Sequence, residues 1–141
     1  MTESPRAEIV AECYAAFNRE GAPAVLRYVT HDTVWYSAPG WAGKPVFRGQ
    51  AGVLELIAEW TENFVDYQWE PAVPEELSDG RVLLLNRHKG RTRDGVSVDA
   101  PLGSVWELEG DLIATVRFFF TWEEALEAAG VEVPGIGSSA G

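Results

Sequence analysis

The chain has 141 residues, which is the length of a single domain. Its composition, 46% hydrophobic and 23% charged, excludes a disordered chain and a small disulfide-stapled protein. The net charge of -11 disfavours nucleic acid and anionic lipid as partners. The apolar runs fall far short of the roughly 20 residues that a membrane-spanning helix needs, so no membrane partner is expected.

The N-terminal segment indicates where the protein works. The first six residues are polar and acidic and do not form a signal pattern of charged and then apolar residues. The single cysteine, Cys13, cannot form an internal disulfide. We therefore expect a cytoplasmic protein.

Three helices are predicted in the first half of the chain. Ser4 and Pro5 provide an N-cap and a first helical residue, and an apolar stripe then runs to a stop at Gly21. Pro23 opens a short second helix, and an amphipathic pattern predicts a third over residues 50–63. Between the last two, residues 33–36 are typical of a strand, and residues 37–49 form a loop rich in Gly and Pro.

The second half predicts a sheet and a final short helix. Residues 65–70 alternate apolar with polar, residues 81–93 and 96–109 flank an Asp94-Gly95 hairpin turn, and residues 112–120 follow a second turn. The segment from Thr121 to Glu124 is a capping box, and Gly130 ends the helix that it opens. We expect residues 1–131 to form one domain and residues 132–141 to be a flexible tail.

The strand register predicts one charge on the core face. A two-residue turn at Asp94-Gly95 places Arg87 opposite Leu102, on a face shared with Leu83 and Leu85, and a buried guanidinium needs partners for its five donors. Arg87 then either pairs with an internal carboxylate or carbonyl, or contacts a ligand. A bulge near Pro101 would shift the count by one and turn His88 inward instead.

Several segments together resemble the nuclear transport factor 2-like superfamily, particularly its SnoaL-like polyketide cyclase branch. The resemblance runs from about Arg6 to Val131. It rests on segments 13–18 (CYAAFN), 30–35 (THDTVW), 47–49 (FRG), 87–91 (RHKGR) and 123–130 (EEALEAAG). The fold implied is an α+β, cystatin-like barrel: a cone-shaped, curved antiparallel sheet wrapped around three N-terminal helices, with a short C-terminal helix and an apolar pocket inside. Members commonly form homodimers through the outer face of the sheet, and we expect the same here.

The resemblance also implies a site. Six Trp, six Phe and four Tyr are compatible with a walled cavity or with a solid interior. The expected catalytic residues are Arg87, Tyr14, which matches an oxyanion donor on the first helix, and His88. The expected substrate-binding residues, with Trp41 and Phe47 as candidates for a lid, are Trp35, Ser37, Trp41, Phe47, Trp60, Phe64, Trp69, Leu102, Trp106 and Phe118.

The chain departs from the family at its acids, which leaves catalysis open. Ser37 stands where ketosteroid isomerase-like members have a base aspartate, and Phe118 stands at the acid position of the last strand. Three functions remain: a cofactor-free cyclase, isomerase, dehydratase or hydrolase acting on a hydrophobic oxygenated molecule such as a polyketide or terpenoid; a non-catalytic pocket protein for a similar ligand; or a dimeric scaffold. No metal-ligand spacing surrounds His31 or His88, so neither a cofactor nor a metal is expected.

Overall fold

The computed structural model describes residues 5–41, 43–70 and 72–131. The helical elements are α1 (Pro5–Glu20), α2 (Ala22–Val25), the 3-10 turn η1 (Leu26–Tyr28), α3 (Gly49–Thr61) and α4 (Trp122–Ala129). The strands are β1 (Val29–Tyr36), β2 (Val46–Arg48), β3 (Gln68–Trp69), β4 (Glu75–Glu76), β5 (Val82–Arg91), β6 (Ser97–Glu109) and β7 (Leu112–Phe119).

The four predicted helices are confirmed. α1 ends at Gly21, whose φ of 91° is in the left-handed region that glycine adopts without steric cost. The Thr121 hydroxyl caps α4 by accepting from the backbone N–H of Glu124 at 3.1 Å, and Gly130, in the left-handed conformation, ends that helix. The proposed N-cap Ser4 and the tail at 132–141 lie outside the described residues.

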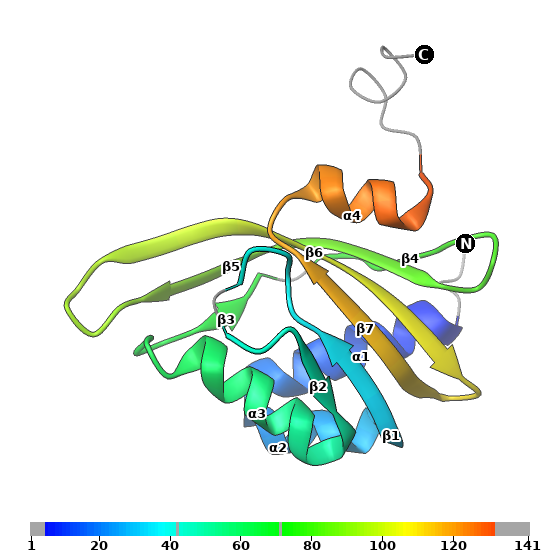
Figure 1. Ribbon diagram of the computed structural model, residues 1–141, viewed down its shortest axis with the longest axis horizontal. Helices are drawn as coiled ribbons and strands as arrows, with labels where there is room; N and C mark the ends of the chain where they lie inside the picture. The colour runs from blue at the N-terminus through cyan, green and yellow to red at the C-terminus, as the bar shows by residue number, and fades with distance from the viewer. Residues whose placement is uncertain (1–4, 42, 71, 132–141) are drawn as a thin grey trace, which may run out of the picture.

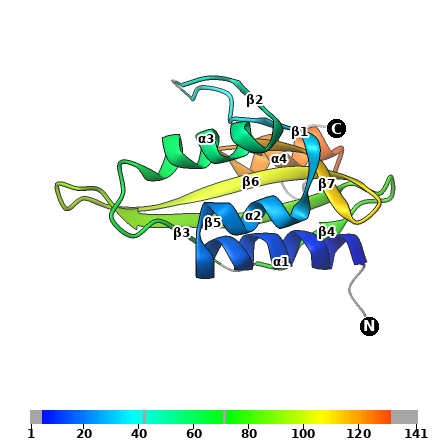
Figure 2. The ribbon, with the colours of Figure 1, turned by 90° about the horizontal axis from the view of Figure 1, so that it is seen from below.

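The sheet is curved and has the strand order β2-β1-β7-β6-β5-β3, with β4 also paired to β5. The predicted meander of β5, β6 and β7 is confirmed, and β1 joins β7 in parallel. β2 lies within the segment predicted as a loop, and β3 and β4 are only two residues each. Helices α1, α2 and α3 cover the concave face, whereas α4 lies on the opposite, outer face (Figures 1 and 2). The α+β class and the curved sheet are as predicted.

The register between β5 and β6 differs from the predicted one by one residue. The backbone N–H of Thr92 donates to Val96 O at 2.8 Å, so the turn holds three residues rather than two. Gly95, with φ 94°, supplies the left-handed residue of a three-residue turn, and the Thr92 hydroxyl accepts from Val96 N–H at 3.0 Å. The turn length, not a bulge near Pro101, causes the shift.

This shift exchanges the two faces of β5. Arg87 pairs with Pro101, and His88 pairs with Ala100 and with Trp69 of β3. His88 therefore lies on the concave side and Arg87 on the outer side. The predicted core-face position of Arg87 is wrong, and the alternative inward position of His88 is correct.

The turn between β6 and β7 is also shorter than the three-residue turn predicted at residues 109–111, yet most side chains keep their predicted faces. Glu109 pairs with Leu112 across a shorter turn, and the register shifts again between Glu107 and Leu108. Along most of the ladder the pairing is offset by two residues from the predicted one. An even offset keeps each side chain on its face, so Trp106 and Phe118 still lie in the interior.

A second, smaller cluster lies on the outer face beneath α4. Leu83 and Val105 of the sheet pack there against Ala125 and Ala129 of the helix. Leu83 and Leu85, predicted for the main core, belong to this side because of the register shift. Gly103 permits the close approach, since a Cβ at this position would lie 2.5 Å from that of Ala125.

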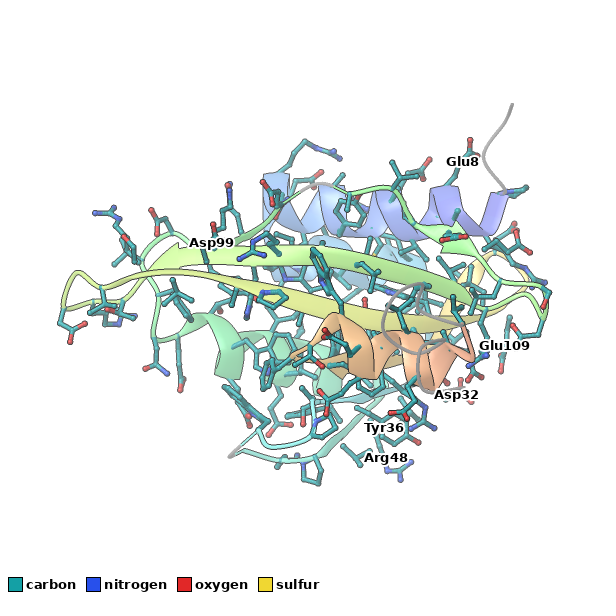
Figure 3. All side chains as sticks on the ribbon, turned by 90° about the horizontal axis from the view of Figure 1, so that it is seen from above. Glu8, Asp32, Tyr36, Arg48, Asp99 and Glu109 are labelled. Atoms are coloured by element: carbon teal, nitrogen blue, oxygen red, sulfur yellow. The ribbon has the colours of Figure 1, made fainter. Side chains whose placement is uncertain are left out.

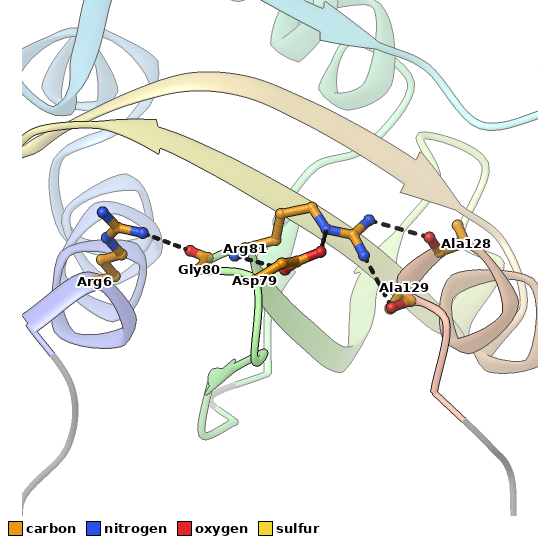
Figure 4. Close-up of polar contacts among 6 residues, drawn as sticks. All are labelled: Arg6, Asp79, Gly80, Arg81, Ala128 and Ala129. Carbon is orange, nitrogen blue, oxygen red and sulfur yellow. Dashed lines mark hydrogen bonds and ion pairs between the residues drawn. The ribbon is translucent and has the colours of Figure 1, made fainter.

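A charged clamp ties α4 to the turn before β5 (Figure 4). The Arg81 guanidinium donates to the backbone carbonyls of Ala128 and Ala129 at 3.1 and 3.0 Å, at the C-terminal end of α4, and to Asp79 at 2.8 Å. A cation favours the negative end of the helix dipole. Arg6 of α1 donates to Gly80 O in the same turn at 3.1 Å, so α1 and α4 are linked through it.

Candidate functional site

The interior of the curved sheet contains a small, apolar cavity. Its space is about 20 Å³, room for about one water molecule. Its lining comes from α1, α2, α3 and the concave face of the sheet: Cys13, Tyr14, Phe17, Val25, Trp35, Leu56, Ile57, Trp60, Thr61, Tyr67, Trp69, Trp106 and Phe118. We call this space the inner cavity. Its walls are tightly packed rings; Trp60 and Phe118, for example, have centroids 4.8 Å apart.

A larger pocket of about 290 Å³ lies between α3, the segment that follows it, and the ends of β5 and β7. Its lining is Trp41, Trp60, Asn63, Phe64, Tyr67, His88 and Phe120, and we call it the mouth pocket. Trp60 and Tyr67 line both spaces, so these two side chains form the partition between them. Of these two spaces, the mouth pocket is the one large enough for a small organic ligand.

A chain of three polar side chains crosses this partition. The Trp69 indole N–H donates to Tyr67 Oη at 3.1 Å, and Tyr67 Oη lies 2.8 Å from His88 Nδ1. The His88 ring also stacks on Phe120, with centroids 6.5 Å apart and planes at 20°. Burial lowers the pKa of His88, as does nearby Arg87, while Asp99 opposes the shift. Burial raises the pKa of the Tyr67 hydroxyl. Both groups are therefore neutral near pH 7.

The hydrogen bonds determine which His88 nitrogen carries the proton. Tyr67 Oη accepts from Trp69, and its own proton has one partner among the described residues, His88 Nδ1. Donation from Tyr67 to Nδ1 satisfies both groups and leaves the single imidazole proton on Nε2. Nε2 makes no hydrogen bond to the part of the chain that the structure describes. His88 thus offers an N–H donor in a wall that is mostly aromatic.

Gly90 allows Tyr67 to lie beside His88. A Cβ at residue 90 would lie 2.9 Å from the Phe64 ring and 3.3 Å from Tyr67 Cα. The segment carrying these two rings is fastened to β5 by the bridge between Phe64 and Thr92 and by donation from Val65 N–H to Arg91 O at 2.8 Å. Because Gly90 has no side chain, the segment that carries Phe64 and Tyr67 can pack closely against β5.

Most of the predicted binding residues line one of the two spaces. Trp35, Trp69, Trp106 and Phe118 line the inner cavity, Trp41 and Phe64 line the mouth pocket, and Trp60 lines both.

Three predicted binding residues lie elsewhere. Phe47 and Leu102 are fully buried packing residues that line neither space, so Phe47 is not part of a lid. The Ser37 hydroxyl donates to Lys44 O at 2.8 Å and lies beside a separate surface hollow. These three residues therefore line neither the inner cavity nor the mouth pocket.

Two of the three predicted catalytic residues are engaged in other contacts. Arg87 donates to Asp99 Oδ1 at 2.6 Å and to Asp99 O at 3.2 Å on the outer face, where its side chain is 37% exposed. Figure 3 looks onto this face and labels Asp99. Tyr14 lines the inner cavity, but its hydroxyl donates to the Ala72 carbonyl and accepts from Ala72 N–H at 3.1 Å. Of the three, only His88 reaches the mouth pocket.

Three residues that line the mouth pocket were not predicted from the sequence: Asn63, Tyr67 and Phe120. Tyr67 and Phe120 had a readable signal, because each lies two residues from a ring that was selected, Trp69 and Phe118, and alternate strand residues share a face. Asn63 follows α3 in an irregular segment and carries no such signal.

Other chemistries find little support in the described part of the chain. Burial raises the pKa of the Cys13 thiol to about 12, so it is not a ready nucleophile. Residues 5–41, 43–70 and 72–131 contain no group of three or more His, Cys, Asp or Glu side chains that could hold a metal ion, and no helix long and apolar enough to cross a membrane.

Comparison with known proteins gives one family and many similar folds. The sequence profile described as a SnoaL-like domain matches residues 10–116. A search of curated proteins found no match.

Three solved structures illustrate the similarity of fold. An NTF2-like protein of unknown function from Burkholderia pseudomallei K96243 has 22% identity and a TM-score of 0.74, over 89% of this chain and 97% of that chain. TerC co-crystallized with polyporic acid has 18% identity and a TM-score of 0.73, over 90% and 99%. An uncharacterized cystatin fold protein from Novosphingobium aromaticivorans has 21% identity and a TM-score of 0.65, over 84% and 99%.

Proposed function

Since the chain belongs to the SnoaL-like domain family, within the nuclear transport factor 2-like superfamily, we propose that its mouth pocket binds a ring-bearing, mostly apolar small molecule that carries a carbonyl oxygen. The walls support an apolar, ring-bearing ligand. Trp41, Trp60, Phe64 and Phe120 surround a space of about 290 Å³, and aromatic walls of this kind bury flat apolar surface efficiently. TerC, a protein of similar fold, was crystallized with polyporic acid.

The observation that carries the proposal is the His88 ring with its free Nε2–H. A neutral imidazole donor in an apolar wall selects a hydrogen-bond acceptor such as a carbonyl oxygen, and would stabilise negative charge that develops there. Arg87 and Tyr14, the other predicted catalytic residues, are paired elsewhere. His88 is therefore the group that orients the ligand.

Binding is favoured over turnover by the nature of the lining. No carboxylate is among the described residues that line either space, and proton abstraction next to a carbonyl ordinarily requires such a base. An enzymatic role would be limited to a step in which charge develops on the carbonyl oxygen while the substrate supplies its own base. Cyclisation and isomerisation belong to this class.

Three matched tricyclic probes test the proposal: 9,10-dihydroanthracene, anthrone and 9,10-anthraquinone, with zero, one and two carbonyl groups. Equilibrium dialysis gives their dissociation constants. We expect anthrone to bind about fivefold to tenfold more tightly than dihydroanthracene, which is the effect of one neutral hydrogen bond. In His88→Phe, which keeps a ring against Phe120, the preference for anthrone should fall.

Arg87→Met is the matched control on the same strand. This variant should keep the preference for anthrone, because Arg87 lies on the outer face. The proposal is overturned if the wild-type protein does not distinguish the two probes, or if His88→Phe retains the full preference. Release of a rearranged product from anthrone or a related enone would establish turnover as well.

A further inference from the structure

The six tryptophans differ in one respect, which is the state of the indole N–H. Five donate hydrogen bonds: Trp35 to Thr33 Oγ1 at 3.0 Å, Trp41 to Glu59 Oε1 at 3.0 Å, Trp69 to Tyr67 Oη at 3.1 Å, Trp106 to Ser104 Oγ at 2.8 Å and Trp122 to Asn86 O at 2.9 Å. The sixth, Trp60 Nε1, is buried and has no hydrogen-bond partner among the described residues. The fold has provided an acceptor for every indole except the one that forms the partition between the two spaces.

An unpaired buried donor is costly, because folding removes it from water without a replacement. Trp60 is 5% exposed, and its ring is held by edge contacts with Trp41 at 5.9 Å and Phe118 at 4.8 Å. Among the described residues, two other side chains have buried polar atoms without a hydrogen-bond partner, Thr30 and Asn86. Neither lines the inner cavity or the mouth pocket. Of these three side chains, Trp60 is the one that lines the cavity walls.

We propose that the Trp60 indole N–H is a second recognition donor, which takes a second oxygen of the ligand. The inference rests on the proposed function and narrows its ligand class to molecules with two acceptor oxygens, one for His88 and one for Trp60. Quinones and diketones have this arrangement. The ligand oxygen replaces the acceptor that the protein lacks, so the interaction forms only in the complex.

The contrast with Trp41 provides the control. Trp41 and Trp60 are in ring contact and both line the mouth pocket, but the Trp41 N–H is already held by Glu59. Replacing Trp41 by Phe removes apolar surface from the pocket wall but removes no free hydrogen-bond donor. Replacing Trp60 by Phe removes a similar wall area together with the free donor.

The experiment compares anthraquinone with anthrone, which differ in the second carbonyl. In the wild-type protein anthraquinone should bind about fivefold to tenfold more tightly than anthrone. In Trp60→Phe the ratio should fall to about two, the statistical factor for two equivalent oxygens at His88. In Trp41→Phe both affinities should change by the same factor. A ratio that Trp60→Phe leaves unchanged overturns the inference.

A second measurement needs no variant and separates this inference from the proposed function. In the wild-type NMR spectrum, the Trp60 indole proton is identified by its contacts with the Trp41 and Phe118 rings. It should move downfield when anthraquinone binds and stay in place with dihydroanthracene. No movement at saturation overturns the role of Trp60, whereas loss of the anthrone preference over dihydroanthracene overturns the role of His88.

Discussion

The inner cavity and the mouth pocket share two walls but differ in their polar groups. In the inner cavity Trp35, Trp106 and Tyr14 have their polar atoms paired within the protein, and the space holds about one water molecule. In the mouth pocket His88 keeps a free nitrogen beside a space of about 290 Å³. Whether the polar atoms are paired thus distinguishes a packed core from a binding site. The aromatic content does not, because both spaces are lined with rings.

The largest effect should come from truncating a ring on the inner side. Trp106 is fully buried, and Trp106→Ala should lower the free energy of unfolding by about 3–5 kcal/mol. Phe64→Ala, at the partly exposed mouth, should cost about 1 kcal/mol. Urea unfolding measures both values, and equal losses would mean that the two spaces are parts of one core.

Gly90→Ala tests whether the close packing at Gly90 fixes the position of Tyr67 in the partition. The new methyl group would press on the Phe64 ring and on Tyr67 Cα, so we expect a loss of about 1–3 kcal/mol in urea unfolding. The added variant Phe64→Ala should recover part of that loss, because one of the two close contacts disappears. Strictly additive losses would show that the close approach at Gly90 is not the cause.

The pH dependence of stability should reflect the burial of the His88 ring. The folded-state pKa of His88 lies below its ordinary value of 6.5, so the unfolded chain takes up this proton first as the pH falls. The stabilisation from neutral His88 is complete above pH 6.5 and is lost as the pH drops below it. The wild-type protein should therefore lose more stability than His88→Phe between pH 7 and pH 5. If thermal unfolding shows the same loss of stability for both proteins over this pH range, the lowered pKa of His88 is contradicted.

The smallest effect should come from the outward neighbour of His88. Arg87 and Asp99 form an exposed ion pair, so Arg87→Met should change the melting temperature only slightly, and 1 M salt should remove the difference. A large loss that persists in salt would show that Arg87 supports the fold in a way that the ion pair does not explain.

The sequence predicted the elements well because each carried its own periodic or capping signal. The apolar stripe of α1 and the capping box at Thr121 are local patterns, and the structure confirms both. β2 had no such signal, since its three residues become a strand only by pairing with β1.

The candidate site was harder to predict, because the face on which each residue of β5 lies depends on the length of one turn. Asp94-Gly95 suits a turn of two or of three residues, and the difference decides whether Arg87 or His88 faces the interior. The side chain of Thr92, which bonds to Val96 N–H and to Asp94, helps to close the longer form. The free N–H of Trp60 could not be predicted, because it depends on which neighbours lack an acceptor. The predicted homodimer stays a prediction, and α4 covers part of the outer face on which it relies.

The most direct test of the account is the NMR spectrum of the His88 ring nitrogens, recorded with and without saturating anthrone. Without the probe, we predict a neutral ring with the proton on Nε2 and with Nδ1 accepting from Tyr67. With anthrone, the Nε2 resonance should shift while Nδ1 stays nearly constant. A ring protonated on Nδ1, or an Nε2 resonance unmoved by a bound probe, would contradict the assignment of the mouth pocket as the binding site.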